Sequence, residues 1–195
     1  MTTYAYEAFA SGSSPSADRV ASITQSPVTG SSGSQVTSFE YDELGRRKKV
    51  YLPDHTSGTP KTVTTTFDAA GRVATVRGSA GARTQPVDYT YDNQGRMKTL
   101  TTYQGESGST LTGAATTEWK YNPHRGWLDE KRYQDTSAST GSAAANSGPT
   151  YTYTHGGKPA TREWRRNNAG SSTRTRTTYT YNEGVICGRP STTTR

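Results

Sequence analysis

Aromatic and polar residues alternate over short stretches of this chain, and each stretch ends at a turn-forming sequence. Phe39-Glu40-Tyr41 runs into Asp42–Gly45, and Tyr89-Thr90-Tyr91 runs into Asp92–Gly95. Alternation of period two with aromatic and Thr residues is typical of a half-buried strand. The pattern therefore predicts short antiparallel strands joined by tight turns.

The Asp-x-x-Gly sequences at Asp42–Gly45, Asp68–Gly71 and Asp92–Gly95 predict three hairpin tips. Asp suits the first position of a type I turn because its carboxylate accepts a hydrogen bond from the backbone N–H two residues on. Gly suits the fourth position because the backbone there often needs a positive φ. We expect an all-β chain with a positive φ at all three of these glycines.

An Arg follows each turn and opens the return strand. In Val73–Val76 and Met97–Leu100 the apolar residues at the two ends stand three positions apart, not two. The spacing fits a β-bulge or a strand whose two faces are both partly covered, and the sequence leaves both possibilities open.

The motif aromatic-Asp-x-x-Gly-Arg thus occurs at 41–46, 67–72 and 91–96. It resembles the YD repeat of the Rhs family, which is also the repeat of teneurins and of the shell-forming C component of insecticidal toxin complexes. The resemblance covers roughly residues 4–181. It implies successive antiparallel hairpins that form a curved, open segment of a spiral β-shell around a hollow chamber. It also implies a non-catalytic structural segment, secreted or at the cell surface, of proteins that enclose a toxin or act on other cells.

We divide the chain into three parts. Residues 1–35 form a degraded N-terminal repeat, with Tyr4–Glu7 as a strand that lacks its Asp-x-x-Gly, and a connector. Residues 36–103 hold the three well-formed repeats, and residues 104–195 hold degenerate repeats, Gly/Ser/Thr-rich connectors and an irregular tail. Because a repeat buries its apolar face by stacking on its neighbours, uncapped ends predict further repeats of a parent or neighbouring chain as partners, with a toxin as possible cargo.

The degenerate copies change the turn residues. The copy at 117–128 has Asn122 in place of Asp and one extra turn residue, and the copy at 151–158 has Thr154 in place of Asp and Lys158 in place of Arg. A last copy starts at Thr177, and its pattern fails at Gly184–Cys187.

Composition favours a thin sheet over a compact core. Only 29% of the residues are hydrophobic and 10% are aromatic, and the mean hydropathy is −0.91. The aromatic content argues against a disordered chain. No apolar run is long enough to span a membrane, and the start lacks the basic and apolar regions of a signal peptide. With the resemblance, this start indicates the interior of a longer protein or an unusually short relative.

The net charge of +7 raises a second interpretation. The denser cationic cluster comprises Arg162, Arg165, Arg166, Arg174 and Arg176. Such a cluster is usually a solvated face, but it also fits the alternative function, a carbohydrate- or polyanion-binding β-repeat module. Nucleic acid is not an expected partner.

Residues with catalytic or metal-binding chemistry are scattered. His55, His124 and His155 are isolated near turns, and Cys187 has no partner cysteine. The turn aspartates are explained by their structural place. We therefore expect no catalytic, cofactor-binding or metal-binding residue and no cofactor. Trp119, Trp127 and Trp164 could stack on sugars, although aromatics that alternate in strands more often form cross-strand pairs.

Overall fold

The computed structural model describes residues 1–7, 19–26, 33–53, 61–107, 110–133, 147–168, 171–181 and 190–194. Its regular elements are all strands: β1 (Thr2–Tyr6), β2 (Val20–Gln25), β3 (Gln35–Tyr41), β4 (Arg47–Leu52), β5 (Lys61–Phe67), β6 (Val73–Gly78), β7 (Val87–Tyr91), β8 (Met97–Thr102), β9 (Gly105–Ser107), β10 (Thr110–Thr112), β11 (Ala115–Tyr121), β12 (Leu128–Tyr133), β13 (Gly148–Tyr153), β14 (Pro159–Asn168), β15 (Ser171–Tyr179) and β16 (Pro190–Thr194). The all-β prediction is confirmed. The described residues contain no helix of the length and apolarity that crossing a membrane requires.

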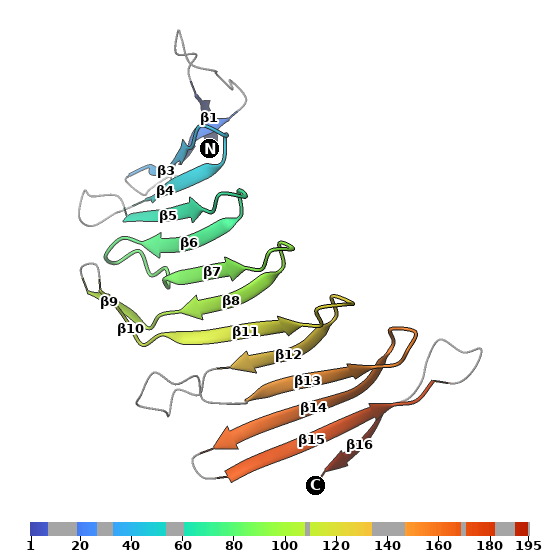
Figure 1. Cartoon of the computed structure of the whole chain (residues 1–195). Helices are drawn as coiled ribbons and strands as arrows, with labels where there is room; N and C mark the ends of the chain where they lie inside the picture. Colours follow the sequence, from blue (N-terminus) through green and yellow to red (C-terminus); the bar gives the residue numbers. More distant parts are fainter. Residues whose placement is uncertain are drawn as a thin grey trace. The chain divides into compact units, whose positions relative to one another are not determined.

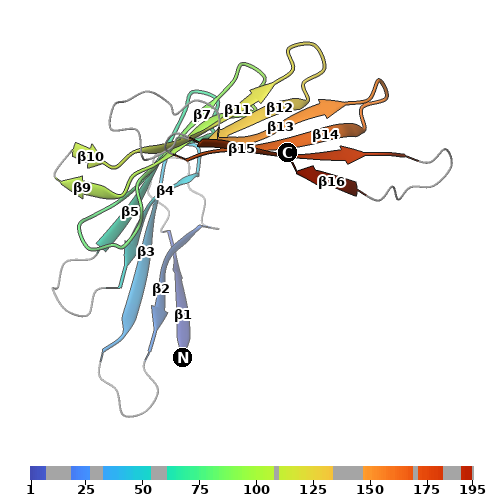
Figure 2. The same ribbon diagram turned by 90° about the horizontal axis from the view of Figure 1, so that it is seen from below.

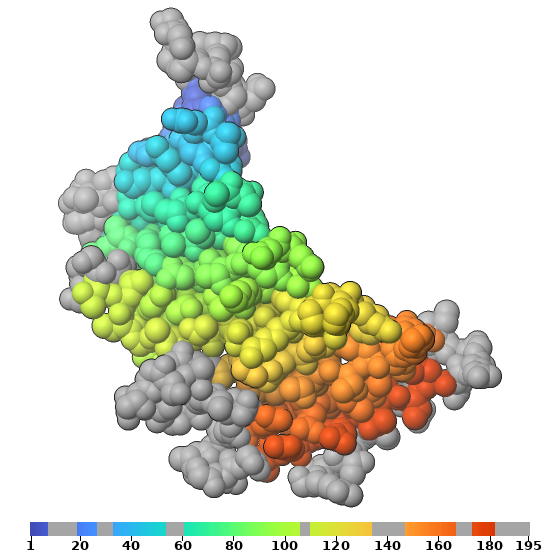
Figure 3. Space-filling model, in the orientation of Figure 1, coloured from blue at the N-terminus to red at the C-terminus, as the bar shows by residue number. Residues whose placement is uncertain are grey.

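The strands follow the sequence order, from β1 to β8 and then from β11 to β16, and β9 pairs with β10 as a separate two-stranded ribbon (Figures 1 and 2). The chain forms two compact units, residues 1–88 with 104–112 and residues 89–103 with 113–195. Within each unit, neighbouring strands pair antiparallel, and the hairpins follow one another as bands of colour (Figure 3). The predicted succession of antiparallel hairpins is confirmed, while the division at residues 35 and 103 stays a prediction.

The three predicted turns join β3 to β4, β5 to β6 and β7 to β8. In each of them the Gly N–H donates to the backbone carbonyl of the Asp over 2.9 Å. The φ angles of Gly45, Gly71 and Gly95 are +78°, +81° and +83°. Both predictions, the position of the tips and the left-handed glycines, are confirmed.

A β-bulge lies directly after the turn. Phe67 pairs with Val73 and Thr66 with Thr75, so Ala74 is an extra residue in the return strand. The extra residue places Val73 and Val76 on the same face although they are three positions apart. The same register shift occurs in the β1–β2, β3–β4, β11–β12 and β13–β14 hairpins. The bulge explains the spacing of the apolar residues in β6, and both faces of β6 are also half-buried, so the two possibilities that the sequence left open hold together here.

The described part of the sheet has no conventional core. None of the described hydrophobic residues is fully buried. One face carries cross-strand hydroxyl pairs, with 2.7 Å between the Oγ1 atoms of Thr66 and Thr75 and the same distance between those of Thr152 and Thr161. The residues that alternate with these threonines, among them Phe67, Tyr151 and Tyr153, lie on the other face. Contacts between successive hairpins must therefore supply what a core supplies elsewhere.

We expect Gly71→Ala to lower the free energy of unfolding by about 1–2 kcal/mol, because Cβ is strained in the left-handed region. An added Cβ would also lie 3.1 Å from Nη1 of Arg46. Urea titration followed by circular dichroism measures the change. The control is Gly156→Ala in a later turn, where nothing lies within 4 Å of the added Cβ and the change should stay within about 0.5 kcal/mol. Equal effects of the two substitutions would contradict this assignment of the turn.

Candidate functional site

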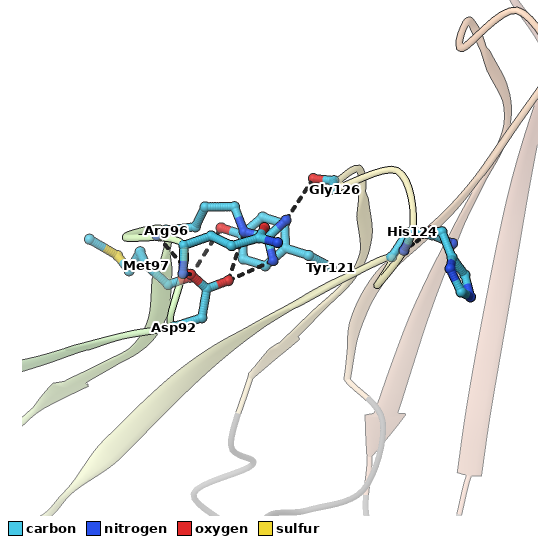
Figure 4. A network of polar contacts seen from close by, with 8 residues as sticks. Asp92, Arg96, Met97, Tyr121, His124 and Gly126 are labelled. Carbon is cyan, nitrogen blue, oxygen red and sulfur yellow. Dashed lines mark hydrogen bonds and ion pairs between the residues drawn. The ribbon is translucent and has the colours of Figure 1, made fainter.

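The turn edge of the sheet carries the recurrent polar residues, and each turn Asp binds the Arg that follows it. In the third repeat, Asp92 Oδ1 accepts hydrogen bonds from the backbone N–H groups of Gln94 and Arg96, both 2.9 Å long. Asp92 Oδ2 accepts a hydrogen bond from Arg96 Nε over 2.7 Å and lies 2.6 Å from Nη2 (Figure 4). The first two repeats show the same arrangement. The carboxylate thus closes the turn and fixes the guanidinium.

The fixed guanidinium reaches the next repeat. The Arg96 guanidinium carbon lies 4.1 Å from the centroid of the Tyr121 ring, and Nη1 donates to the Gly126 carbonyl over 3.1 Å (Figure 4). Arg46 covers the Phe67 ring at the same distance of 4.1 Å. We call this contact, between the cation after one turn and the ring before the next turn, the inter-repeat contact. It links each hairpin to the next one along the chain by the attraction between a cation and an aromatic ring.

A hydroxyl bond accompanies the contact. The Tyr before a turn donates its hydroxyl to the carbonyl of the residue after the previous repeat's Arg or its replacement. The donor–acceptor pairs are Tyr41–Val20 at 2.9 Å, Tyr121–Met97 at 3.0 Å, Tyr153–Leu128 at 2.7 Å and Tyr181–Pro159 at 2.7 Å. Since the acceptor carbonyl sits at the bulge, the bond satisfies a group that the irregular pairing would otherwise expose.

The turn glycine has a second role in this geometry. A Cβ at Gly126 would lie 3.1 Å from Nη1 of Arg96, and a Cβ at Gly45 would lie 3.1 Å from Nη1 of Arg19. The glycine therefore adopts the positive φ of the turn and also leaves room for the guanidinium of the preceding repeat. This role is not visible in the turn sequence alone, because the guanidinium comes from the preceding repeat.

The hydrogen bonds to the turn carboxylates favour their charged form. Desolvation alone would raise the pKa of Asp42 and of Asp92, but the backbone and guanidinium donors of the following Arg outweigh it and hold each pKa below 3.8. The pKa of Asp68 is lowered chiefly by the side-chain hydrogen bond from Arg72. The turn aspartates are therefore poor proton acceptors near neutral pH, which agrees with a structural use.

The first, degraded repeat keeps the contact through a different acid. Glu7 N–H donates to the Arg19 carbonyl over 2.9 Å, and Arg19 Nε lies 3.0 Å from Glu7 Oε2. Arg19 in turn lies over the Tyr41 ring at 5.0 Å. Glu7 thus takes the place of the turn Asp. Sequence reasoning missed this pair because eleven residues separate its members.

The fourth repeat places Trp127 where the three well-formed repeats have Arg. The Trp127 and Tyr153 rings lie 4.9 Å apart, and a Cβ on Gly157 would lie 2.9 Å from Trp127. Arg125 stacks on Trp127 at 4.8 Å and donates to the His155 carbonyl over 3.0 Å. In the third repeat, Arg96 alone covers the next ring and donates to the next turn. Here Trp127 covers the ring of Tyr153, and Arg125 donates to the next turn.

The residues with catalytic or metal-binding chemistry do not form a cluster in the part of the chain that the structure describes. His124 and His155 are exposed residues of two turns, and His55 and Cys187 lie outside the described residues. Among the residues that are described, no three or more His, Cys, Asp or Glu side chains gather in a way that could hold a metal ion. The expected absence of catalytic, cofactor-binding and metal-binding residues stays a prediction.

Trp119, Trp164 and several arginines of the cluster contact other side chains of the sheet. Lys131 lies 5.0 Å from the centroid of its cross-strand partner Trp119, and the Trp164 and Tyr133 rings are 6.0 Å apart. Arg162 stacks on Trp164 at 5.3 Å. The cluster is divided between the two faces of the sheet, because Arg165, Arg174 and Arg176 surround Glu163 on the opposite face.

Comparison with known families supports the assignment of the aromatic-Asp-x-x-Gly-Arg motif to a known repeat. Residues 67–110 match the family model described as RHS Repeat. This segment is similar to the Rhs repeat. The match begins at Phe67, the ring covered by Arg46, and includes the Asp68–Arg72 and Asp92–Arg96 turns. The match confirms the resemblance inferred from the sequence over residues 67–110 and supports a structural, repeat-forming role. No curated protein matches the chain.

Solved structures with some likeness come from toxin complexes. A crystal structure of TcdB2-TccC3-TEV aligns with 14% identity over 93% of this chain and 13% of that chain, with a TM-score of 0.40. A Tc holotoxin pore from Photorhabdus luminescens aligns with 12% identity over 92% of this chain and 12% of that chain, with a TM-score of 0.41. The chain spans only that small share of their length, and at these TM-scores the likenesses carry no functional argument.

Acid should weaken the turns. The folded pKa values of Asp42, Asp68 and Asp92 lie below 3.8, so the folded state binds fewer protons than the unfolded state. The stabilisation is complete above pH ~4 and is lost as the pH falls through the folded values. We expect the urea midpoint to drop below pH ~4, as measured by circular dichroism. Replacing all three by Asn should make this drop smaller; an unchanged pH profile would contradict the Asp–Arg pairing.

Tyr121→Phe should remove the hydroxyl bond and keep the ring contact. Phe67 shows that a ring without a hydroxyl is covered normally. We expect a loss of about 1 kcal/mol in the free energy of unfolding, the value of one such bond. Tyr121→Ala should cost more, because it also removes the ring under Arg96. Urea unfolding measures both; equal losses would show that the ring contact contributes nothing.

Proposed function

We propose that the chain is a non-catalytic wall segment of an Rhs-type repeat shell. The proposal is carried by the inter-repeat contact. The recurrent side chains of the turn edge are engaged in linking one hairpin to the next: Asp holds Arg, Arg covers a ring, and Gly leaves room for the Arg. These residues build an extensible sheet, and their groups are used in holding it together.

The exposure of β1, the first strand of the sheet, supports the proposal that a further repeat packs next to it. All residues of β1 are exposed, and Tyr6, which occupies the position of the ring before the turn, is 57% exposed. The equivalent Tyr41 has a cation over its ring and a carbonyl at its hydroxyl. A further repeat, from a parent or neighbouring chain, would supply both to Tyr6. Such an exposed edge is also a site for pairing between chains.

A second part of the proposal concerns the cargo that the wall encloses. The YD-type motifs resemble those of shells that enclose a toxin, and we infer the same use here, in a secreted or cell-surface protein. An autonomous polyanion-binding module is the competing function, and it predicts a self-sufficient monomer.

The exposed edge gives a direct experiment. We expect the isolated chain to associate with rising concentration in size-exclusion chromatography with light scattering. Tyr4→Lys with Tyr6→Lys should shift it toward the monomer, because charges on an edge strand oppose pairing. The matched control is Val36→Lys with Leu44→Lys, which replaces two other exposed apolar residues away from the β1 edge.

Circular dichroism of the same proteins separates the two functions. A wall segment should melt broadly and gain cooperativity when a neighbouring hairpin is fused before β1. A sharp, cooperative melt of a monomeric chain would contradict the proposal and favour the autonomous module.

A further inference from the structure

A pocket of about 450 Å³ lies at the fourth repeat, within the compact unit of residues 89–103 and 113–195. We call it the fourth-repeat pocket. Its lining includes three aromatic side chains and one carboxylate, those of Trp127, Tyr151, Tyr153 and Asp129. Such a combination of rings and a negative charge favours a cationic ligand.

The bulge of the fourth repeat does not need the carboxylate that lines this pocket. Asp129 is the extra residue of the bulge in the β11–β12 hairpin. The same position is held by Ala74 in the β5–β6 hairpin and by Ala160 in the β13–β14 hairpin. Because Ala forms the bulge in these two hairpins, the wall function gives no reason for an acid at this position.

The charge of Asp129 is not neutralised within the described part of the chain. Asp129 is half-buried, and its carboxylate forms no hydrogen bond or ion pair with a described residue. Arg125, which also lines the pocket, is engaged elsewhere, since it lies over Trp127 and donates to the His155 carbonyl. The connector after β12, residues 134–146, contains no Lys or Arg. Burial and then the charge of Asp129 raise the pKa of the Tyr153 hydroxyl, so this charge acts on the rings of the pocket.

The third repeat shows which group fits a ring beside a carboxylate. There the Arg96 guanidinium binds the Asp92 carboxylate through Nε and Nη2 and lies 4.1 Å from the centroid of the Tyr121 ring (Figure 4). In the fourth-repeat pocket, Tyr153 contacts Trp127 in place of a cation. The pocket therefore offers both partners of a guanidinium, an aromatic ring and an acid, and its acid is free to bind one.

We propose that the fourth-repeat pocket binds the guanidinium group of an arginine side chain from a partner protein. A guanidinium is planar and weakly hydrated, stacks on aromatic rings and donates paired N–H groups to a carboxylate. The ammonium group of lysine is strongly hydrated and lacks this planar fork. Arginine side chains already make this type of contact inside the chain. The inference does not depend on the wall function, because it uses a residue that the wall does not require.

The test is a titration of the full chain, labelled with fluorotryptophan, with a short peptide that carries one central Arg and blocked ends. The chain has three tryptophans, and fluorine NMR follows each of them. Trp119 and Trp164 are internal controls, because Lys131 and Arg162 already lie over their rings. We expect the Trp127 signal alone to shift and to saturate, with weaker binding as salt rises. The same peptide with Lys or citrulline in place of Arg should bind at least ~3-fold more weakly.

Asp129→Ala tests the role of the carboxylate. It should weaken binding of the Arg peptide at least ~3-fold, and the chain should still fold, because Ala forms the equivalent bulge twice. Circular dichroism verifies the fold. The matched control is Glu43→Ala, which removes the same charge from an exposed turn residue and should change the affinity less than ~1.5-fold.

Several outcomes would overturn the proposal. Equal weakening by the two variants would show that only net charge matters, and equal shifts of the three tryptophan signals would show that there is no site. Equal binding of the Lys or the citrulline peptide would overturn the choice of a guanidinium. Tighter binding of free arginine than of the peptide would overturn the choice of a protein partner. The comparisons between peptides use the unchanged chain, so they decide the question even where a variant fails to fold.

Discussion

The structure depends on the Arg guanidinium of each well-formed turn, which binds the turn Asp and also contacts the aromatic ring of the next repeat. In each well-formed turn, the Asp carboxylate holds the following Arg by its Nε and Nη2 atoms. Arg46 and Arg96 then lie 4.1 Å from the ring of the next repeat. The described residues include no fully buried hydrophobic side chain, so these contacts take over part of the work of a core. Each cation–ring contact is worth about 0.5–1 kcal/mol at such exposed sites, and their repetition along the sheet makes them significant.

The degenerate copies show what the arrangement requires. Asn122 Oδ1 accepts hydrogen bonds from the N–H groups of His124, two residues on as in the Asp turns, and of Arg125, three residues on. The Thr154 hydroxyl accepts one from Lys158 N–H. Trp127 covers the next ring in place of an Arg. Each replacement preserves an acceptor in the turn or a flat or cationic group over the ring, so variation in sequence leaves the linkage between hairpins intact.

Sequence reasoning succeeded where the interaction is local. The hairpin tips and the positive φ of Gly45, Gly71 and Gly95 follow from four-residue turns, and both are confirmed. The partners of Arg96 and Tyr121 could not be found in this way, because connectors of varying length separate them from their own turns. The bulge stayed open for a similar reason, since it depends on the register against the opposite strand. The arginine cluster was recognised, but its division between two faces required the strand pairing.

A double-mutant cycle on Arg96 and Tyr121 tests the central claim most directly. The free energy of unfolding is measured for Arg96→Gln, Tyr121→Leu and the pair, with a control cycle that combines Arg96→Gln with Tyr153→Leu. If the inter-repeat contact couples the hairpins, the Arg96–Tyr121 cycle should show a coupling of about 0.5–1 kcal/mol and the control cycle almost none. Additivity of both cycles within ~0.3 kcal/mol would contradict the account.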